Sequence, residues 1–160
     1  MVSRMSAVEP VRYQMLTAPP VPVREILVGT GWGERYVAGM AAAADLYARE
    51  GSAHVTVAYA GAYPAGFVLC ELHEWNGLAQ LQGLAVHVDC RRRGIAAELV
   101  CRAETFARGA GARGVFVDTP VDNNGGRRFY EALGYDEAYS MPQYYDHGLD
   151  GVTYQRFFAG

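Results

Sequence analysis

The chain has 160 residues, of which 51% are hydrophobic and 19% are charged, and its formal net charge is −3. This length fits one domain with its own core, and the acidic balance gives no electrostatic reason to expect nucleic-acid binding. All 14 basic residues are arginine, which excludes a Schiff-base lysine and the lysine of a P-loop nucleotide hydrolase.

The first half of the chain has the pattern of a strand, two helices and three strands. After a frayed start over residues 1–10, we place these elements at residues 11–17, 22–28, 34–50, 52–60, 65–74 and 78–87. Asn76-Gly77, between the last two strands, is typical of a β-hairpin. The glycine-rich segment from Gly29 to Gly33 joins the two helices, and we interpret it as a mobile substrate lid.

The second half alternates helices and strands. A helix over residues 94–108 places Ile95, Leu99, Ala103 and Phe106 on one face. A strand at 115–119, a helix at 123–133 and strands at 135–144 and 152–158 complete the chain. The order β-α-α-β-β-β-α-β-α-β-β predicts a single mixed α/β (α+β) domain over residues 1–160, with a central, largely antiparallel sheet flanked by helices.

The segment from Leu81 to Ala96 indicates an anion-binding site. It combines an apolar strand, a polar turn and then Arg91-Arg92-Arg93-Gly94-Ile95-Ala96 at the start of the long helix. The first amides of a helix have no intrahelical partner and lie at the positive end of the helix dipole, so they favour phosphate-like anions. The arginines add charge, and the glycine leaves the backbone open to a bulky ligand.

Two motifs make the chain similar to the GNAT N-acetyltransferase superfamily. Arg91–Ala96 matches its loop Gln/Arg-x-x-Gly-x-Gly/Ala, and Leu84-Ala85-Val86 matches the Leu-x-Val strand before that loop. Asn123–Tyr135 matches the later signature Asn-x-x-Ala-x-x-Phe-Tyr-Glu-x-Leu-Gly-Phe, with Gly126 in place of the alanine. Because the motifs occur in family order with a strand between them, together they are more specific than either alone.

The resemblance implies that acetyl-CoA binds in a cleft between two splayed strands. The backbone of Leu84 to Val86 would pair with the pantetheine arm like an added strand. The amides of Arg92 to Ala96 would hold the pyrophosphate, and the arginine side chains would reach the phosphates. Asn123 would either contact the pantetheine or cap its helix. The implied coenzyme-binding residues are Leu84, Ala85, Val86, Arg91, Arg92, Arg93, Gly94, Ile95, Ala96, Asn123 and Tyr130.

Direct transfer to an amine needs a general acid, an oxyanion donor and a base. By resemblance, Tyr130 would protonate the leaving thiolate and the Val86 amide would stabilise the oxyanion. Gln80 stands where many relatives carry a glutamate that orders a water molecule as the base, and an amide cannot take up the proton. The base stays open among Glu71, His73, Glu74, Asp118 and a water molecule ordered by Gln80.

We expect an N-acetyltransferase that uses acetyl-CoA and no metal. The expected acceptor is a primary amine on a small molecule, such as an amino acid, a polyamine or an aminoglycoside, with a protein amine as the other class. Trp32 and Tyr36 are candidates for the acceptor pocket, as are Tyr144 or Tyr145 in a tyrosine-rich loop over residues 143–148. The alternative is a non-catalytic acyl-CoA-binding or sensory domain, and a homodimer is left open.

The three cysteines are scattered, and neither they nor the histidines have metal-ligand spacing. We expect Cys70 and Cys101 in the core and Cys90 at the surface. The sequence starts without the apolar core of a signal peptide, and its longest apolar run, residues 37–44, is too short to span a bilayer. We therefore expect a cytoplasmic protein that binds neither membranes nor nucleic acids.

Overall fold

The computed structural model describes residues 9–51 and 53–159, so the predicted frayed start lies almost wholly outside the described residues. The elements are β1 (Val11–Met15), α1 (Val23–Leu27), α2 (Glu34–Arg49), β2 (Ala53–Ala60), β3 (Tyr63–His73), β4 (Leu78–Val86), the 3-10 turn η1 (Val88–Cys90), α3 (Ile95–Gly109), β5 (Gly114–Pro120), α4 (Asn124–Ala132), β6 (Asp136–Asp146) and β7 (Leu149–Phe157). The predicted order of helices and strands is confirmed, with boundaries that differ by at most three residues.

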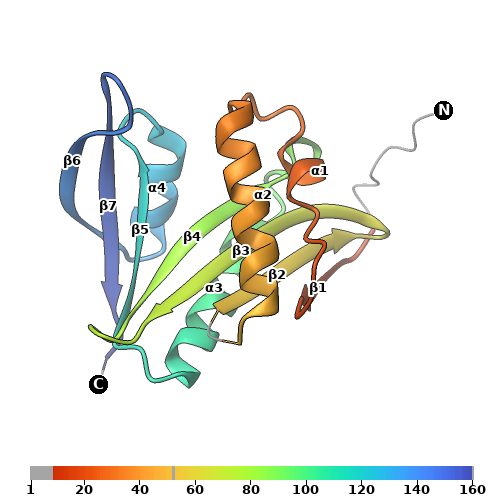
Figure 1. Cartoon of the computed structure of the whole chain (residues 1–160), viewed down its shortest axis with the longest axis horizontal. Coiled ribbons are helices and arrows are strands. Elements are labelled where there is room, and N and C mark those ends of the chain that lie inside the picture. Colours follow the sequence, from red (N-terminus) through yellow and green to blue (C-terminus); the bar gives the residue numbers. More distant parts are fainter. Residues whose placement is uncertain (1–8, 52, 160) are drawn as a thin grey trace.

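A seven-stranded sheet runs through the fold with the strand order β1-β2-β3-β4-β5-β7-β6 (Figure 1). The β4–β5 pair is parallel and the other neighbouring pairs are antiparallel, which confirms the predicted mixed, largely antiparallel sheet. Helices α1 and α2 cover one face, and α3 and α4 lie on the other. Among the described residues, no helix is long and apolar enough to cross a membrane.

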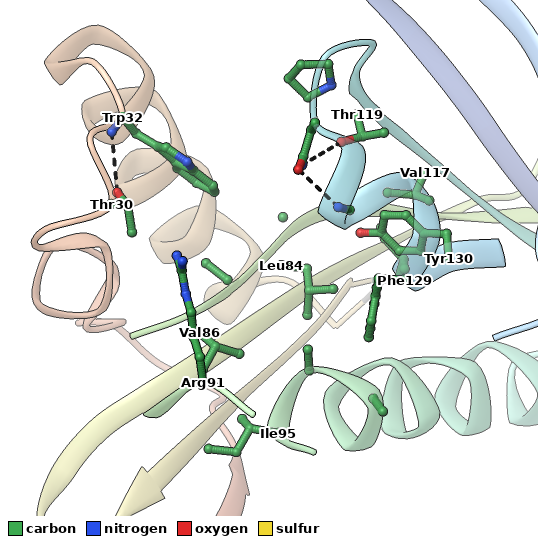
Figure 2. Close-up of a pocket in the computed structure, with 18 of the residues that line it drawn as sticks. Thr30, Trp32, Leu84, Val86, Arg91, Ile95, Val117, Thr119, Phe129 and Tyr130 are labelled. Atoms are coloured by element: carbon green, nitrogen blue, oxygen red, sulfur yellow. Dashed lines mark hydrogen bonds between the residues drawn. The ribbon is translucent and has the colours of Figure 1, made fainter. Parts of the chain in front are cut away.

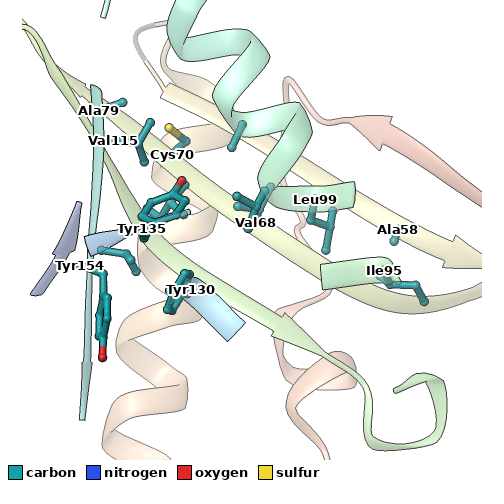
Figure 3. Packing of buried hydrophobic residues seen from close by; sticks show 14 of the residues in the cluster. Ala58, Val68, Cys70, Ala79, Ile95, Leu99, Val115, Tyr130, Tyr135 and Tyr154 are labelled. Atoms are coloured by element: carbon teal, nitrogen blue, oxygen red, sulfur yellow. The ribbon is translucent and has the colours of Figure 1, made fainter. Parts of the chain in front are cut away.

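The central strands are buried on both faces because their side chains alternate between two cores. On β3, Val68 and Cys70 belong to the core under α3 and α4, whereas Phe67 and Leu69 belong to the core under α1 and α2. Figure 3 shows the first of these cores, where Leu99 of α3 faces Val68. We call the two faces of the sheet the α3 face and the α2 face, after the longer helix on each.

A β-bulge at Gln82 changes the direction of β4 in the middle of the sheet. Leu69 of β3 pairs with Gly83 and Cys70 pairs with Leu81, so Gln82 is the extra residue. Beside it, β4 pairs with β5 only from Leu78 to Leu81. A bulge bends and twists its strand, and the second half of β4 therefore diverges from β5 (Figure 1).

The predicted loop over residues 143–148 is wrong. Strand β6 continues to Asp146 and turns through Gly148, which has φ +73°, into β7. The pairing is irregular between Met141 and Asp146, yet the tyrosines keep an extended backbone, as the high strand propensity of tyrosine favours.

The cysteine assignments hold for one residue of the three. Cys70 is buried as predicted, but Cys90 is also buried and Cys101 is exposed. Cys90 ends the turn η1 and belongs to the α3-face core, whereas Cys101 lies on the exposed side of α3. Within residues 9–51 and 53–159, no group of three or more His, Cys, Asp or Glu side chains could hold a metal ion.

Candidate active site

A cavity of about 460 Å³ opens where β4 and β5 diverge. Its size is that of a small-molecule site. Its walls come from the α1–α2 connection, the second half of β4, the start of α3, the end of β5, α4 and β6 (Figure 2). The lining residues include Thr30, Trp32, Tyr36, Gln82, Leu84, Ala85, Val86, Arg91, Arg92, Gly94, Ile95, Ala96, Asp118, Thr119, Asn123, Phe129, Tyr130 and Tyr145.

The start of α3 presents free amides to this cavity. The first hydrogen bond of the helix joins the Glu98 N–H to the Gly94 carbonyl at 3.1 Å. The amides of Ile95 to Ala97 therefore have no partner within the helix. Arg92 and Gly94 have φ values of +64° and +75°. A left-handed backbone is unusual for arginine, and successive amides in such a turn form a concave anion site. A Cβ atom at Gly94 would meet nothing within 4 Å, so the space next to this residue is open.

The three arginines of the loop differ in position. Arg91 and Arg92 line the cavity, and Figure 2 shows the Arg91 side chain reaching past Val86 toward Thr30. The Arg93 guanidinium instead donates to the Glu9 carbonyl at 2.6 Å. Arg91 and Arg92 therefore face the cavity, whereas Arg93 is held at Glu9, two residues before β1.

The diverging part of β4 turns unpaired backbone toward the cavity. The His87 N–H donates to the Ala65 carbonyl of β3 at 2.7 Å. Successive amides of a strand point to opposite edges, so the Val86 and Leu84 amides point away from β3, toward the open edge. This is the orientation that the predicted oxyanion and pantetheine contacts require.

Asn123 caps α4, which confirms one of its two predicted roles. Its Oδ1 accepts from the Gly126 amide at 3.0 Å and its Nδ2 donates to Thr119 Oγ1 at 3.1 Å (Figure 2). A Cβ atom at Gly126 would lie 2.5 Å from Asn123 Nδ2, so glycine leaves room for this arrangement of the cap. Asn123 also lines the cavity, and its contact with a coenzyme stays a prediction.

Tyr130 is 6% exposed and lies between the cavity and the core. Its ring packs near Phe129, Tyr135 and Tyr154, with centroid distances of 5.2, 5.7 and 6.1 Å. Figure 2 shows its hydroxyl pointing into the cavity. Burial raises the pKa of Tyr130. The phenol therefore keeps its proton at neutral pH, as a general acid must.

Of the candidates for the base, Asp118 alone lines the cavity. It lies near the end of β5 and accepts a hydrogen bond from the buried Thr153 hydroxyl of β7. Glu71 accepts from Tyr47 and Gln82, and Gln80 accepts from Gln82, so both lie behind Gln82. His73 packs against Phe116, and Glu74 is exposed in the β3–β4 turn.

Aromatic side chains also line the cavity. Trp32 and Tyr36 line it as an edge-to-face pair with ring centroids 5.0 Å apart, and Tyr145 lines it from β6. Tyr144 lies just outside the cavity, near the carboxylate of Asp118. Burial, followed by the charge of Asp118, raises the pKa of Tyr144. All four predicted acceptor-side aromatic residues therefore lie in or beside the cavity.

The two faces of the sheet divide the cavity into two halves. Leu84 and Val86 pack with the α3-face core, together with Tyr130. Val117 belongs to the same core, so Asp118 points to the α2 face.

Gln82, which sequence reasoning missed, is on the α2 face as well, because its partner Glu71 contacts Tyr47 of α2. A polar residue between Leu81 and Gly83 in an apolar strand was the signal available for it.

The family model described as "Acetyltransferase (GNAT) family" matches residues 25–135. The chain belongs to this family. It is similar to an uncharacterized N-acetyltransferase of Methanocaldococcus jannaschii, with 34% identity over 46% of this chain and 35% of that protein. It is also similar to N-alpha-acetyltransferase 30 of Schizosaccharomyces pombe, with 31% identity over 56% of this chain and 61% of that protein. This chain therefore spans between about a third and three fifths of the length of these two relatives.

Solved structures confirm the GNAT fold. A putative acetyltransferase of the GNAT family from Desulfovibrio desulfuricans superposes with a TM-score of 0.82 at 21% identity, over 94% of this chain and all of that chain. A putative streptothricin acetyltransferase from Bacillus anthracis, in complex with acetyl coenzyme A, superposes with a TM-score of 0.66 at 19% identity, over 71% and 67% of the two chains. At these identities the similarity establishes the fold of this GNAT chain.

Proposed function

We propose that this chain is one acetyltransferase domain that moves an acetyl group from acetyl-CoA directly to a primary amine in a ternary complex. The observation that carries the proposal is a cavity that passes between β4 and β5, with free helix amides on the α3 face and a carboxylate among aromatic rings on the α2 face. Such an arrangement lets donor and acceptor enter from opposite faces of the sheet and meet at Tyr130 and Val86.

The α3 half fits the donor. The amides of Arg92 to Ala96 would hold the diphosphate, and Arg91 and Arg92 would neutralise its charge. The open edge of β4 at Leu84 to Val86 would hydrogen-bond the pantetheine amides as a strand does. The open space at Gly94 supports this assignment, because a diphosphate needs to approach the backbone there.

The α2 half fits the acceptor and its chemistry. The amine nitrogen attacks the thioester carbonyl carbon, so that a C–N bond forms, while Asp118 accepts the proton that the nitrogen loses. The Val86 amide stabilises the negative charge on the carbonyl oxygen. The C–S bond then breaks, and Tyr130 supplies the proton that the coenzyme thiolate takes up. The products are an N-acetyl amine and the free thiol of coenzyme A.

The acceptor that we propose is a small primary amine, such as an amino acid, a polyamine or an aminoglycoside. Aromatic faces and a carboxylate together attract ammonium groups, which supports a cationic acceptor. The relatives include proteins named N-alpha-acetyltransferase, so a protein amino terminus is the second acceptor class. We place the reaction in the cytoplasm because the three cysteines are thiols rather than disulfides.

A thiol-release assay tests the proposed function. Acetyl-CoA is supplied with a panel of small primary amines, including 2-phenylethylamine, spermidine and kanamycin, and of short peptides with free amino termini. Amine-dependent release of coenzyme A is expected, with small amines faster than peptides. Tight coenzyme binding without release across the whole panel would instead favour a non-catalytic acyl-CoA-binding domain.

Replacing Tyr130 by phenylalanine should lower kcat by about 10²-fold, because the thiolate loses its proton donor. Phenylalanine keeps the ring packing against Phe129, Tyr135 and Tyr154, so coenzyme affinity and melting temperature should change little. Steady-state kinetics and calorimetric titration measure the two effects. Equal kcat values for both proteins would leave Tyr130 with a packing role alone.

A further inference from the structure

Gln82 occupies an unusual position in the sheet. It is the bulged residue at the point where β4 leaves β5, and it lines the cavity on the α2 face, as Asp118 does. Bulges next to active sites commonly re-aim one side chain. Gly83, the next residue, is packed so closely under α2 that a Cβ atom there would lie 2.6 Å from Met40 Sδ. The backbone of the bulge is therefore held in place by α2.

The amide group of Gln82 has a fixed orientation. Its Nε2 donates to Glu71 Oε2 and to Gln80 Oε1, each at 2.9 Å. A carboxylate only accepts hydrogen bonds at neutral pH, so the side facing Glu71 must be the NH₂ group. Both amide hydrogens are thereby used, and within the described residues the Oε1 atom has no hydrogen-bond partner.

Glu71 is itself held by a hydrogen bond from helix α2. The Tyr47 hydroxyl of α2 donates to Glu71 Oε2 at 2.7 Å. Burial and this hydrogen bond raise the pKa of Tyr47, so the phenol stays a donor. Tyr47, Glu71 and Gln82 thus form a chain of hydrogen bonds that runs from helix α2 to the cavity and ends in a carbonyl oxygen.

We propose that Gln82 is an acceptor-positioning residue, whose carbonyl oxygen accepts one N–H of the amine substrate and selects primary over secondary amines. This inference rests on the proposed function and extends it. A neutral primary amine has two N–H groups. When one points at Gln82 Oε1 and the other at Asp118, the nitrogen lone pair is left to face the thioester. A secondary amine has one N–H, so it satisfies Asp118 alone and places an alkyl group against the Gln82 oxygen.

The test compares 2-phenylethylamine with its N-methyl derivative, or the fastest primary amine of the panel with its own N-methyl derivative. Wild type should prefer the primary amine by about 10-fold or more in kcat/KM, the size of one lost hydrogen bond. In Gln82→Leu the KM for the primary amine should rise by about 10-fold and the preference should fall toward unity, while the KM for acetyl-CoA stays within about 2-fold.

Two further variants sharpen the test. Glu71→Gln removes the anion that fixes the amide and should weaken the preference in the same direction, and it serves if Gln82→Leu does not fold. Gln155→Leu is the matched control, because Gln155 lies on β7, on the α2 face and outside the lining of the cavity. It should leave the preference unchanged.

The possible failures are distinguishable. Absence of thiol release by the wild type with every amine would overturn the proposed function and this inference with it. An active wild type without preference for primary amines, or a Gln82→Leu protein with the wild-type preference, would overturn the positioning role alone.

Discussion

Replacing Gly94 by glutamate is expected to weaken coenzyme A binding by about 100-fold or more. The new carboxylate would occupy the open space in front of the free amides and repel the diphosphate, and the charge-assisted hydrogen bonds lost are worth about 1.5–3 kcal/mol each. The left-handed backbone at Gly94, with φ +75°, adds strain of about 1–2 kcal/mol for any other residue. Calorimetric titration with coenzyme A measures the loss.

The chain offers a matched control for this change. Gly111, just beyond the C-terminal end of α3, also has a positive φ, of +86°, and open space around its Cβ position, but it is not among the cavity-lining residues. Gly111→Glu should lower the melting temperature much as Gly94→Glu does and leave the coenzyme affinity unchanged. If both variants bind coenzyme A as the wild type does, the diphosphate does not lie at the start of α3.

Replacing Asp118 by asparagine should lower kcat by about 10²–10³-fold, because the amine loses its proton acceptor. Asparagine has nearly the same shape, and its oxygen can still accept the hydrogen bond of Thr153, so the fold should be kept. Thiol release at saturating acetyl-CoA and amine measures the effect. The coenzyme affinity should match that of the wild type.

Glu74→Gln is the control for this prediction. Glu74 is another candidate for the base on sequence grounds, and it is exposed in the β3–β4 turn. Its replacement should leave kcat within about 2-fold of the wild-type value, as is usual for an exposed charge. An active Asp118→Asn protein, with kcat near that of the wild type, would show that the proton leaves the amine by another route.

The fold and the donor half of the site could be predicted because their signals are local. Strand and helix periodicity indicated the order of elements, and Arg91–Ala96 and Asn123–Tyr135 are contiguous motifs whose geometry follows from a helix start. The one wrong segment, residues 143–148, contains Gly148 and Asp146, which favour turns, but the turn is confined to the last part of it.

The acceptor half could not be resolved from sequence because it depends on distant contacts. Glu71, His73 and Asp118 each lie near a strand end, and the bulge at Gln82 decides which strand end opens into the cavity. Arg93 is separated by 84 residues from Glu9, whose carbonyl takes its guanidinium away from the cavity. No local pattern shows either contact.

A crystal structure of the protein grown with coenzyme A tests the coenzyme site most directly. We predict the diphosphate within hydrogen-bonding distance of the amides of Arg92 to Ala96, and the pantetheine arm along Leu84 to Val86 with its sulfur near Tyr130. A coenzyme bound elsewhere, with the start of α3 empty, would contradict this assignment.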